Sequence, residues 1–262
     1  MKASKWTEIA MFMMNTLFQK PLIRVGIMLT FTVQLLAVIP DTAHAVHHSC
    51  EPAQVGEELL KGNLPGALTV SEQCAAHYGS KGGSQWFDLV MLAYHKCSVA
   101  QLYAMKGEFQ WAEKAVAEAD ALSPQMTSPL VITGWLDTLL ATKGFVAEKR
   151  GDIQQAKYWY NTRLSQRSAG RLAILAFSEG KHDLASRLAD STLKMHPNDS
   201  TAYAVLGALA ESAGGVEQAR KTYELSLALM AQAPKNHDFL PLTFAESSKI
   251  QEALKRLSKM TP

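Results

Sequence analysis

Apolar residues recur at intervals of three and four along most of the chain after residue 53, with polar residues between them. This period places the apolar side chains on one face of an α-helix. Trp86, Leu89, Val90 and Ala93 are one example. No stretch alternates between apolar and polar residues as a half-buried strand does. The pattern therefore predicts an all-α protein.

Turn and capping residues divide this pattern into pairs of helices. Gly107 and Gly151 mark turns, and Pro129 stands at a first helical position, where proline is tolerated. The last helix is expected to run from Thr243 to Lys259 with its charged residues, Glu246 among them, facing solvent. The other predicted elements are a pair over 53–78 and helices over 84–105, 109–122, 129–149, 153–166, 168–178, 183–195, 200–212 and 216–231.

The same spacing of small residues occurs four times along the chain. A glycine is followed five residues later by an alanine, and further residues of that helical face follow. A fixed period of this kind indicates repeated helical hairpins. The four sets are Gly107, Ala112 and Ala119; Gly151, Ala156 and Tyr160; Gly180, Ala185, Ala189 and Pro197; and Gly214, Ala219 and Tyr223.

These residues make the chain resemble the tetratricopeptide-repeat (TPR) family, whose unit is a helix-turn-helix of 34 residues. Residues 200–233 match best, with Tyr203, Leu206, Gly207, Gly214, Ala219 and Tyr223 in the family's positions. Units over 93–126, 137–165 and 166–199 carry fewer of them, and the unit over 48–81 carries the fewest. The resemblance implies a right-handed α-solenoid of about five repeats over 46–242, with 243–262 as a C-terminal capping helix. Helices 84–105 and 129–149 exceed the family's length, so we expect a changed twist near Ser128.

In TPR proteins the first helices of the repeats line a concave groove that binds peptides. The resemblance implies such a groove here, mixed in character and rather apolar. It suits an amphipathic helix, an extended segment, or the protein's own terminal helix folded back. The alternative is that Phe145, Ile174 and Phe177 pack between neighbouring repeats. The implied groove residues are Tyr94, Gln101, Met105, Phe145, Lys149, Arg167, Ile174 and Phe177.

The N-terminal end predicts export. Residues 25–39 form a short apolar run, with Lys20 and Arg24 before it and the small residues Ala43 and Ala45 after it. These features predict a signal peptide over 1–45, cleaved after Ala45. The run is shorter than the about 20 apolar residues of a membrane span. We expect a periplasmic or secreted protein, and the alternative is an uncleaved inner-membrane anchor facing the periplasm.

The charge balance gives no reason to expect nucleic acid as a partner. Four of the 26 basic and two of the 24 acidic residues lie within residues 1–45, which leaves 22 of each sign in the mature chain. A neutral chain has no general attraction for phosphates or anionic lipids. Contact with a membrane is expected only through the N-terminal segment, if it is not cleaved.

If the protein is exported, its cysteines can form a disulfide, because disulfides persist in oxidising compartments. Cys50, Cys74 and Cys97 allow one intramolecular pair and leave one thiol. In the repeat register that the resemblance implies, Cys50 and Cys74 face one another across the first hairpin, and Cys97 lies free in the groove. The rival pairing is Cys74 with Cys97.

Cleavage after Ala45 would also place a histidine third from a free amine, in the order Val46, His47, His48. The amine, two backbone nitrogens and an imidazole suit the square-planar geometry of Cu(II) or Ni(II), and Cys50 would add a soft ligand nearby. The alternative is a histidine-bearing tail that holds no metal.

Candidate chemistry is otherwise absent from the sequence. There is no Gly-rich phosphate loop and no His-Glu-x-x-His motif, so we expect no enzymatic activity and no cofactor. Large aromatic residues at helical spacing belong more often to a core than to a ligand site, and this is the expectation for Trp86, Trp111, Trp135 and Trp159.

The function expected is therefore an exported scaffold that binds a peptide or helix of a cell-envelope protein in its groove. The alternatives are a periplasmic copper-handling protein that uses His47 and His48, and an accessory subunit of an envelope enzyme. The sequence is also compatible with a homo-oligomer.

Overall fold

The computed structural model describes residue 50 and residues 53–81, 86–233 and 240–260, and no strand occurs in these ranges. The prediction of an all-α protein is confirmed for this part of the chain. None of its helices has the length and hydropathy that a membrane span requires. The predicted signal peptide over 1–45, and with it His47 and His48, lies outside the described residues.

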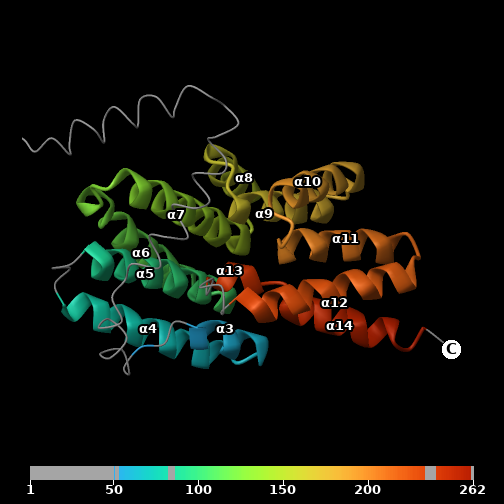
Figure 1. Cartoon of the computed structure of the whole chain (residues 1–262), viewed down its shortest axis with the longest axis horizontal. Coiled ribbons are helices and arrows are strands. Elements are labelled where there is room, and N and C mark those ends of the chain that lie inside the picture. The colour runs from blue at the N-terminus through green and yellow to red at the C-terminus, as the bar shows by residue number, and fades with distance from the viewer. Residues whose placement is uncertain (1–49, 51–52, 82–85, 234–239, 261–262) are drawn as a thin grey trace, which may run out of the picture. The chain divides into compact units, whose positions relative to one another are not determined.

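Five antiparallel helical hairpins follow one another along the described chain (Figure 1). Two short elements, α13 and α14, come after them, and a 3-10 helix, η2, separates α6 from α7. The hairpins are α3 (Ala53–Leu60) with α4 (Leu64–Ser80), α5 (Trp86–Lys106) with α6 (Phe109–Asp120), α7 (Pro129–Arg150) with α8 (Ile153–Thr162), α9 (Gln166–Ser178) with α10 (His182–Met195), and α11 (Ser200–Ser212) with α12 (Val216–Gln232). The remaining elements are η2 (Ser123–Gln125), α13 (Pro241–Phe244) and α14 (Ser247–Leu257).

Each hairpin turns on one glycine in the left-handed region of backbone space, as the sequence predicts. At Gly151, with φ 88°, the backbone closes α7 and Asp152 then caps α8 by accepting from the N–H of Gln155 at 3.0 Å. A side chain at such a φ clashes with its own backbone, which glycine avoids. The five glycines, with φ between 72° and 88°, are Gly62, Gly107, Gly151, Gly180 and Gly214.

Two hairpins share a second feature, a glycine of the first helix against a tyrosine ring of the second. A Cβ added to this glycine would lie 2.4 Å from the ring in one hairpin and 2.6 Å in the other, so no larger residue fits. Each phenol donates a hydrogen bond of 2.9 Å to a glutamate one helical turn after the glycine. The glycine, tyrosine and glutamate are Gly144, Tyr160 and Glu148 in one hairpin, and Gly207, Tyr223 and Glu211 in the other.

Neighbouring hairpins pack through both of their helices: the second helices α4, α6, α8 and α10 each contact the helix that follows, and first helices also contact one another. Helix α5 contacts α4 and α7, α7 contacts α9, and α9 contacts α11. The cluster between α9, α10 and α11 is built largely from alanines, which let the helices approach closely. This packing places side chains of α5, α7 and α9 next to one another.

The C-terminal end returns to the N-terminal hairpin. Helix α13 contacts α3 and α5, α12 contacts α3, and α14 packs on α12 (Figure 1). Leu240, Leu242 and Phe244 are buried in the same core cluster as Val55 and Leu59 of α3. The first and the last hairpin are therefore joined through one hydrophobic core.

The prediction of one continuous helix from Thr243 to Lys259 is wrong. Helix α13 ends at Phe244 and α14 begins at Ser247, because the residues before the break are drawn into the core. Glu246, expected in solvent, is buried in this break. Within α14 the predicted amphipathic character holds, since the buried residues recur at helical spacing and Glu252 is exposed.

The tryptophans are only partly core residues. Trp135 is buried as predicted, but Trp86 is 65% and Trp111 is 53% exposed, so the prediction is wrong for these two. Trp111 stacks on Tyr103, with ring centroids 6.2 Å apart, where it lines an open cleft of about 570 Å³ between α4, α5 and α6. Trp159 is half-buried, with the Lys143 ammonium 5.0 Å from its ring centroid. Helical periodicity could not distinguish the core face of these helices from the outer face.

The turn glycines give a first testable prediction. We expect Gly151→Ala to lower the free energy of unfolding by about 1–2 kcal/mol, because alanine is strained at this φ. Gly134→Ala, in the same helix α7, is the matched control, since its added Cβ would meet nothing closer than 3.9 Å and alanine favours a helix. Chemical denaturation of both variants measures the difference. Equal stability of the two would contradict this account of the turns.

Candidate functional site

The predicted groove corresponds to a face of α5, α7 and α9 against which the chain's own C-terminal end is packed. Helix α13 contacts α5, and this face is joined to residues 240–246 by contacts that include a hydrogen bond to the backbone of Leu242 and an ion pair with Glu246. We call residues 240–257 the C-terminal segment. We call the face of these helices near the C-terminal segment the inner surface. It carries Gln101, Thr142, Phe145, Glu148, Lys149 and Arg171.

Gln101 holds the backbone of the C-terminal segment. Its Oε1 accepts a hydrogen bond of 2.9 Å from the N–H of Leu242, and its Nε2 donates to Thr142 Oγ1 at 2.7 Å. Leu242 lies in the first turn of α13, where an N–H has no acceptor within the helix. The buried amide of Gln101 supplies that acceptor, and Thr142 fixes its orientation.

Arg171 holds the carboxylate of the segment. Its guanidinium donates from Nε to Glu148 Oε2 at 3.0 Å, from Nη2 to the other oxygen of Glu148, and from Nη1 to Glu246 Oε1 at 2.8 Å. Its Cζ lies 5.2 Å from the ring centroid of Phe145, and the side chain is 1% exposed. A planar fork of five donors can bind one carboxylate through two hydrogen bonds and a second carboxylate at the same time, and the compact ammonium of lysine lacks this forked geometry.

Further charged and polar groups surround this bridge. Tyr160 donates its phenolic hydrogen to Glu148 Oε2 at 2.9 Å, and Lys249 Nζ lies 3.0 Å from the second oxygen of Glu246. The Lys149 ammonium stands 5.0 Å from the ring centroid of Phe145. Without Glu246, the inner surface would hold two cations, Arg171 and Lys149, against the single carboxylate of Glu148.

The pKa values follow from burial and from these neighbours. Burial alone would raise the pKa of Glu246, but Arg171, Lys249 and Lys149 outweigh it and lower this pKa to about 2. Burial, together with the charge of Arg171, lowers the pKa of Lys149. Glu246 is therefore an anion at neutral pH, paired in an environment where an unpaired charge would be strongly destabilising.

Three of the predicted groove residues, Gln101, Phe145 and Lys149, lie together on the inner surface. Phe145 is fully buried in the main core. The other two on α5 lie elsewhere: Tyr94 packs at a tilt against Trp135, and Met105 is half-buried at the edge of the core.

The predicted residues of α9 do not join this group. Arg167 is half-buried, and Ile174 and Phe177 pack against the alanine-rich cluster of α9, α10 and α11. The ring of Phe177 stacks on His182 with centroids 5.2 Å apart. Ile174 and Phe177 therefore pack between neighbouring repeats, which was the alternative to a role in a peptide-binding groove.

Sequence reasoning missed Arg171 and misplaced Glu246. Arg171 lies four residues after Arg167 and three before Ile174, so helical spacing places it on the face already under consideration. Glu246 follows the apolar residues Leu240, Leu242 and Phe244, which indicate a buried segment. Its pairing with a residue 75 positions earlier has no local signal.

The predicted Cys50–Cys74 disulfide is present, with Cα atoms 5.1 Å apart, so the rival pairing of Cys74 with Cys97 is wrong. Cys97 has a free thiol, as predicted. The prediction that it lies in an open groove is wrong, because its side chain is fully buried. Burial raises the pKa of its thiol to about 12. Cys50, bonded to Cys74, offers no thiolate to the proposed copper site at His47 and His48.

No protein-family model and no curated protein matches this chain. Among solved structures, a mutant of MamA is similar, with 17% sequence identity and a TM-score of 0.33. The similarity covers 64% of this chain and 97% of that chain.

The charge of Glu246 gives a second testable prediction. Its folded pKa of about 2 is below the ordinary 4.5, so its contribution is complete above pH 4.5 and is lost as pH falls towards 2. We expect Glu246→Gln to lower the free energy of unfolding at pH 7 by about 3 kcal/mol, a deficit that shrinks between pH 4.5 and pH 2. Denaturation at several pH values measures it.

The exposed Glu252 on α14 provides the matched control. Glu252→Gln should leave both the stability and its pH dependence nearly unchanged, because surface charges contribute little. A deficit of Glu246→Gln that stays constant from pH 7 to pH 2 would contradict the role given to its charge.

Proposed function

We propose that this protein is an exported, non-catalytic interaction scaffold that binds an acidic, apolar segment of a cell-envelope protein on its inner surface. The observation that carries the proposal is the pair of contacts from Gln101 to the backbone of Leu242 and from Arg171 to the carboxylate of Glu246. In the resting chain the C-terminal segment occupies the place of the partner.

The chemistry of these contacts is general enough for a second ligand. Gln101 binds a backbone N–H, which every residue except proline offers, and Arg171 binds a carboxylate. A partner would therefore present an apolar residue, in the place of Leu242, and an acidic residue four positions later. The excess positive charge of the inner surface favours such a segment over a neutral one.

The tethered segment sets the affinity that a partner must reach. A segment on the same chain acts at an effective concentration in the millimolar range. A partner must therefore bind more tightly than the C-terminal segment, or bind when that segment is released. The scaffold would discriminate against weak ligands.

Two features support the proposed location and fold. A disulfide such as Cys50–Cys74 persists in oxidising compartments, which agrees with the predicted export. The five hairpins with one left-handed glycine each agree with a right-handed TPR-like solenoid in which the C-terminal segment is the cap. We propose the periplasm as the compartment.

A peptide with the sequence of residues 240–257 tests the inner surface directly. In full-length Glu246→Arg protein the chain's own segment faces Arg171 with a like charge and should leave the inner surface. We expect the labelled peptide to bind this variant at least about tenfold more tightly than wild type, measured by fluorescence anisotropy. A peptide with glutamine at the position of Glu246 should bind the same variant at least about tenfold more weakly.

The controls separate release of the segment from general unfolding. Glu252→Arg adds the same charge at an exposed site of α14 and should leave peptide binding at the wild-type level. Circular dichroism checks the helix content, and Leu242→Ser releases the segment without a new charge. Equal binding of the peptide to wild type and to both release variants would refute the proposal.

A cross-linking experiment tests the partner. A photoreactive amino acid in place of Met105, which is half-buried on α5 one helical turn after Gln101 and so beside the inner surface, is introduced into the exported full chain. We expect cross-links to an envelope protein that increase in the Glu246→Arg background and disappear when the 240–257 peptide is added. Cross-links that the peptide does not displace would mean that the partner binds elsewhere.

A further inference from the structure

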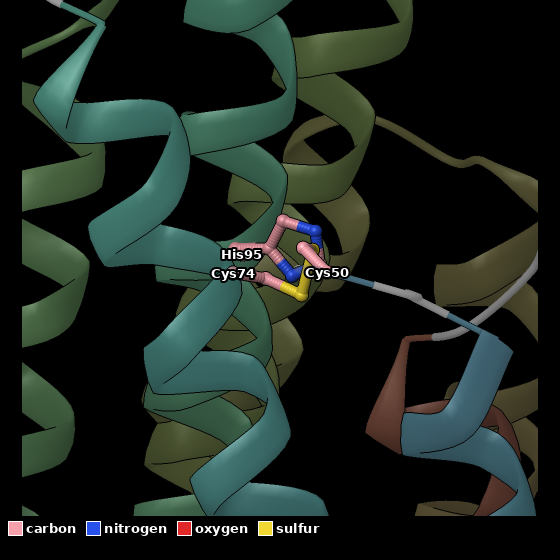
Figure 2. A group of neighbouring side chains, drawn as sticks. All are labelled: Cys50, Cys74 and His95. Carbon is pink, nitrogen blue, oxygen red and sulfur yellow. A yellow bond between two sulfur atoms is a disulfide. The ribbon is translucent and has the colours of Figure 1, made fainter. Parts of the chain in front are cut away.

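Cys50, Cys74 and His95 form a compact group apart from the inner surface. Their two sulfur atoms and one imidazole nitrogen all lie within 4.8 Å of one another (Figure 2). Cys74 belongs to α4 and His95 to α5, while Cys50 precedes α3. The group thus brings three separate parts of the chain together at one point.

The surroundings of the group keep the imidazole in place and uncharged. All three residues are buried, and the ring of Tyr78 stacks on that of His95 with centroids 5.7 Å apart and planes at 9°. Phe87 packs edge-on against Tyr78. Burial favours the neutral imidazole, which is the form in which histidine binds metals.

We propose that reduction of the Cys50–Cys74 disulfide converts this group into a Cys₂His site for Zn²⁺. A cellular dithiol supplies two electrons and two protons: the bond between the two sulfur atoms breaks, two thiols form, and the dithiol becomes a disulfide. Zn²⁺ then binds the two thiolates and the imidazole of His95, and the two thiol protons leave to solvent.

The dimensions of the group fit this ion. Zinc binds sulfur at about 2.3 Å and imidazole nitrogen at about 2.0 Å, so the sulfurs of a tetrahedral site lie about 3.8 Å apart. The ligand atoms already lie within 4.8 Å, and the Cα atoms of the cysteines are 5.1 Å apart. Small rotations of the two cysteine side chains therefore suffice, and a water molecule can fill the fourth position.

The ligand set also selects the ion. Two thiolates and an imidazole suit Zn²⁺ and Cu(I), whereas Ca²⁺ and Mg²⁺ require oxygen ligands. The metal would keep the link between Cys50 and α4 that the disulfide provides in the oxidised protein, and it would add α5 to this link through His95. The N-terminal hairpin would be joined to α5 through the metal in the reduced protein.

Titration of the reduced protein with Zn²⁺ tests the proposal. The chain without the predicted signal peptide is reduced with a phosphine, which is itself oxidised to a phosphine oxide. The reduced protein is kept free of oxygen during calorimetry. We expect one Zn²⁺ per chain with release of two protons, no such binding by the oxidised chain, and an affinity at least about tenfold lower in His95→Gln. Co²⁺ in place of Zn²⁺ should give the intense near-ultraviolet absorption of thiolate ligands.

Two variants and one further measurement complete the test. Cys97→Ser removes the remaining thiol and His182→Gln removes an exposed histidine of α10, and both should keep wild-type affinity. If reduction lowers the helix content, Zn²⁺ should restore the circular dichroism signal in the wild type but not in His95→Gln. No binding by the reduced chain, equal binding by the oxidised chain, or binding unaffected by His95→Gln would each overturn the proposal.

Discussion

The guanidinium of Arg171 is the interaction on which the rest of the described structure depends. It joins α9 to α7 through Glu148 and to the C-terminal segment through Glu246, and it is almost wholly buried. A buried cation is stable only when its charge is matched and its donors are used, and both carboxylates are needed because Lys149 adds a second positive charge nearby. The bridge therefore requires the end of the chain to pack against α7 and α9.

That requirement links folding to function. The contacts that close the structure are a backbone hydrogen bond to Gln101 and an ion pair to Arg171, and these are the contacts by which a scaffold would bind a foreign segment. Apolar burial of Leu242 and Phe244 adds the main non-directional attraction. In the proposed function, the inner surface stays covered until a better ligand replaces the C-terminal segment. The proposed zinc site is independent of this exchange, because Cys50, Cys74 and His95 lie outside the inner surface.

Much of the fold could be predicted from the sequence because its determinants are local. Glycines such as Gly151 define the hairpin turns through their backbone conformation, and Gly207 admits the ring of Tyr223 at a fixed spacing. The pairing of Cys50 with Cys74 was predicted through the repeat register that the TPR resemblance implies, while the rival pairing of Cys74 with Cys97 stayed open until the structure decided it. Less of the candidate site could be predicted: the projected groove residues include Gln101 and Lys149 of the inner surface, but the projection gave no reason to expect the end of the chain against them.

The two tyrosine–glutamate pairs show where sequence ends and tertiary structure begins. Glu148 and Glu211 stand at the same place in their repeats, and each accepts from a tyrosine and pairs with an arginine. Yet Arg171 is 1% exposed and Arg256 is 59% exposed. The sequence by itself determined the helices, their turns and the repeat, since these depend on residues close together along the chain. Only the tertiary structure decided which charges are buried, because burial depends on the distant segment that covers them.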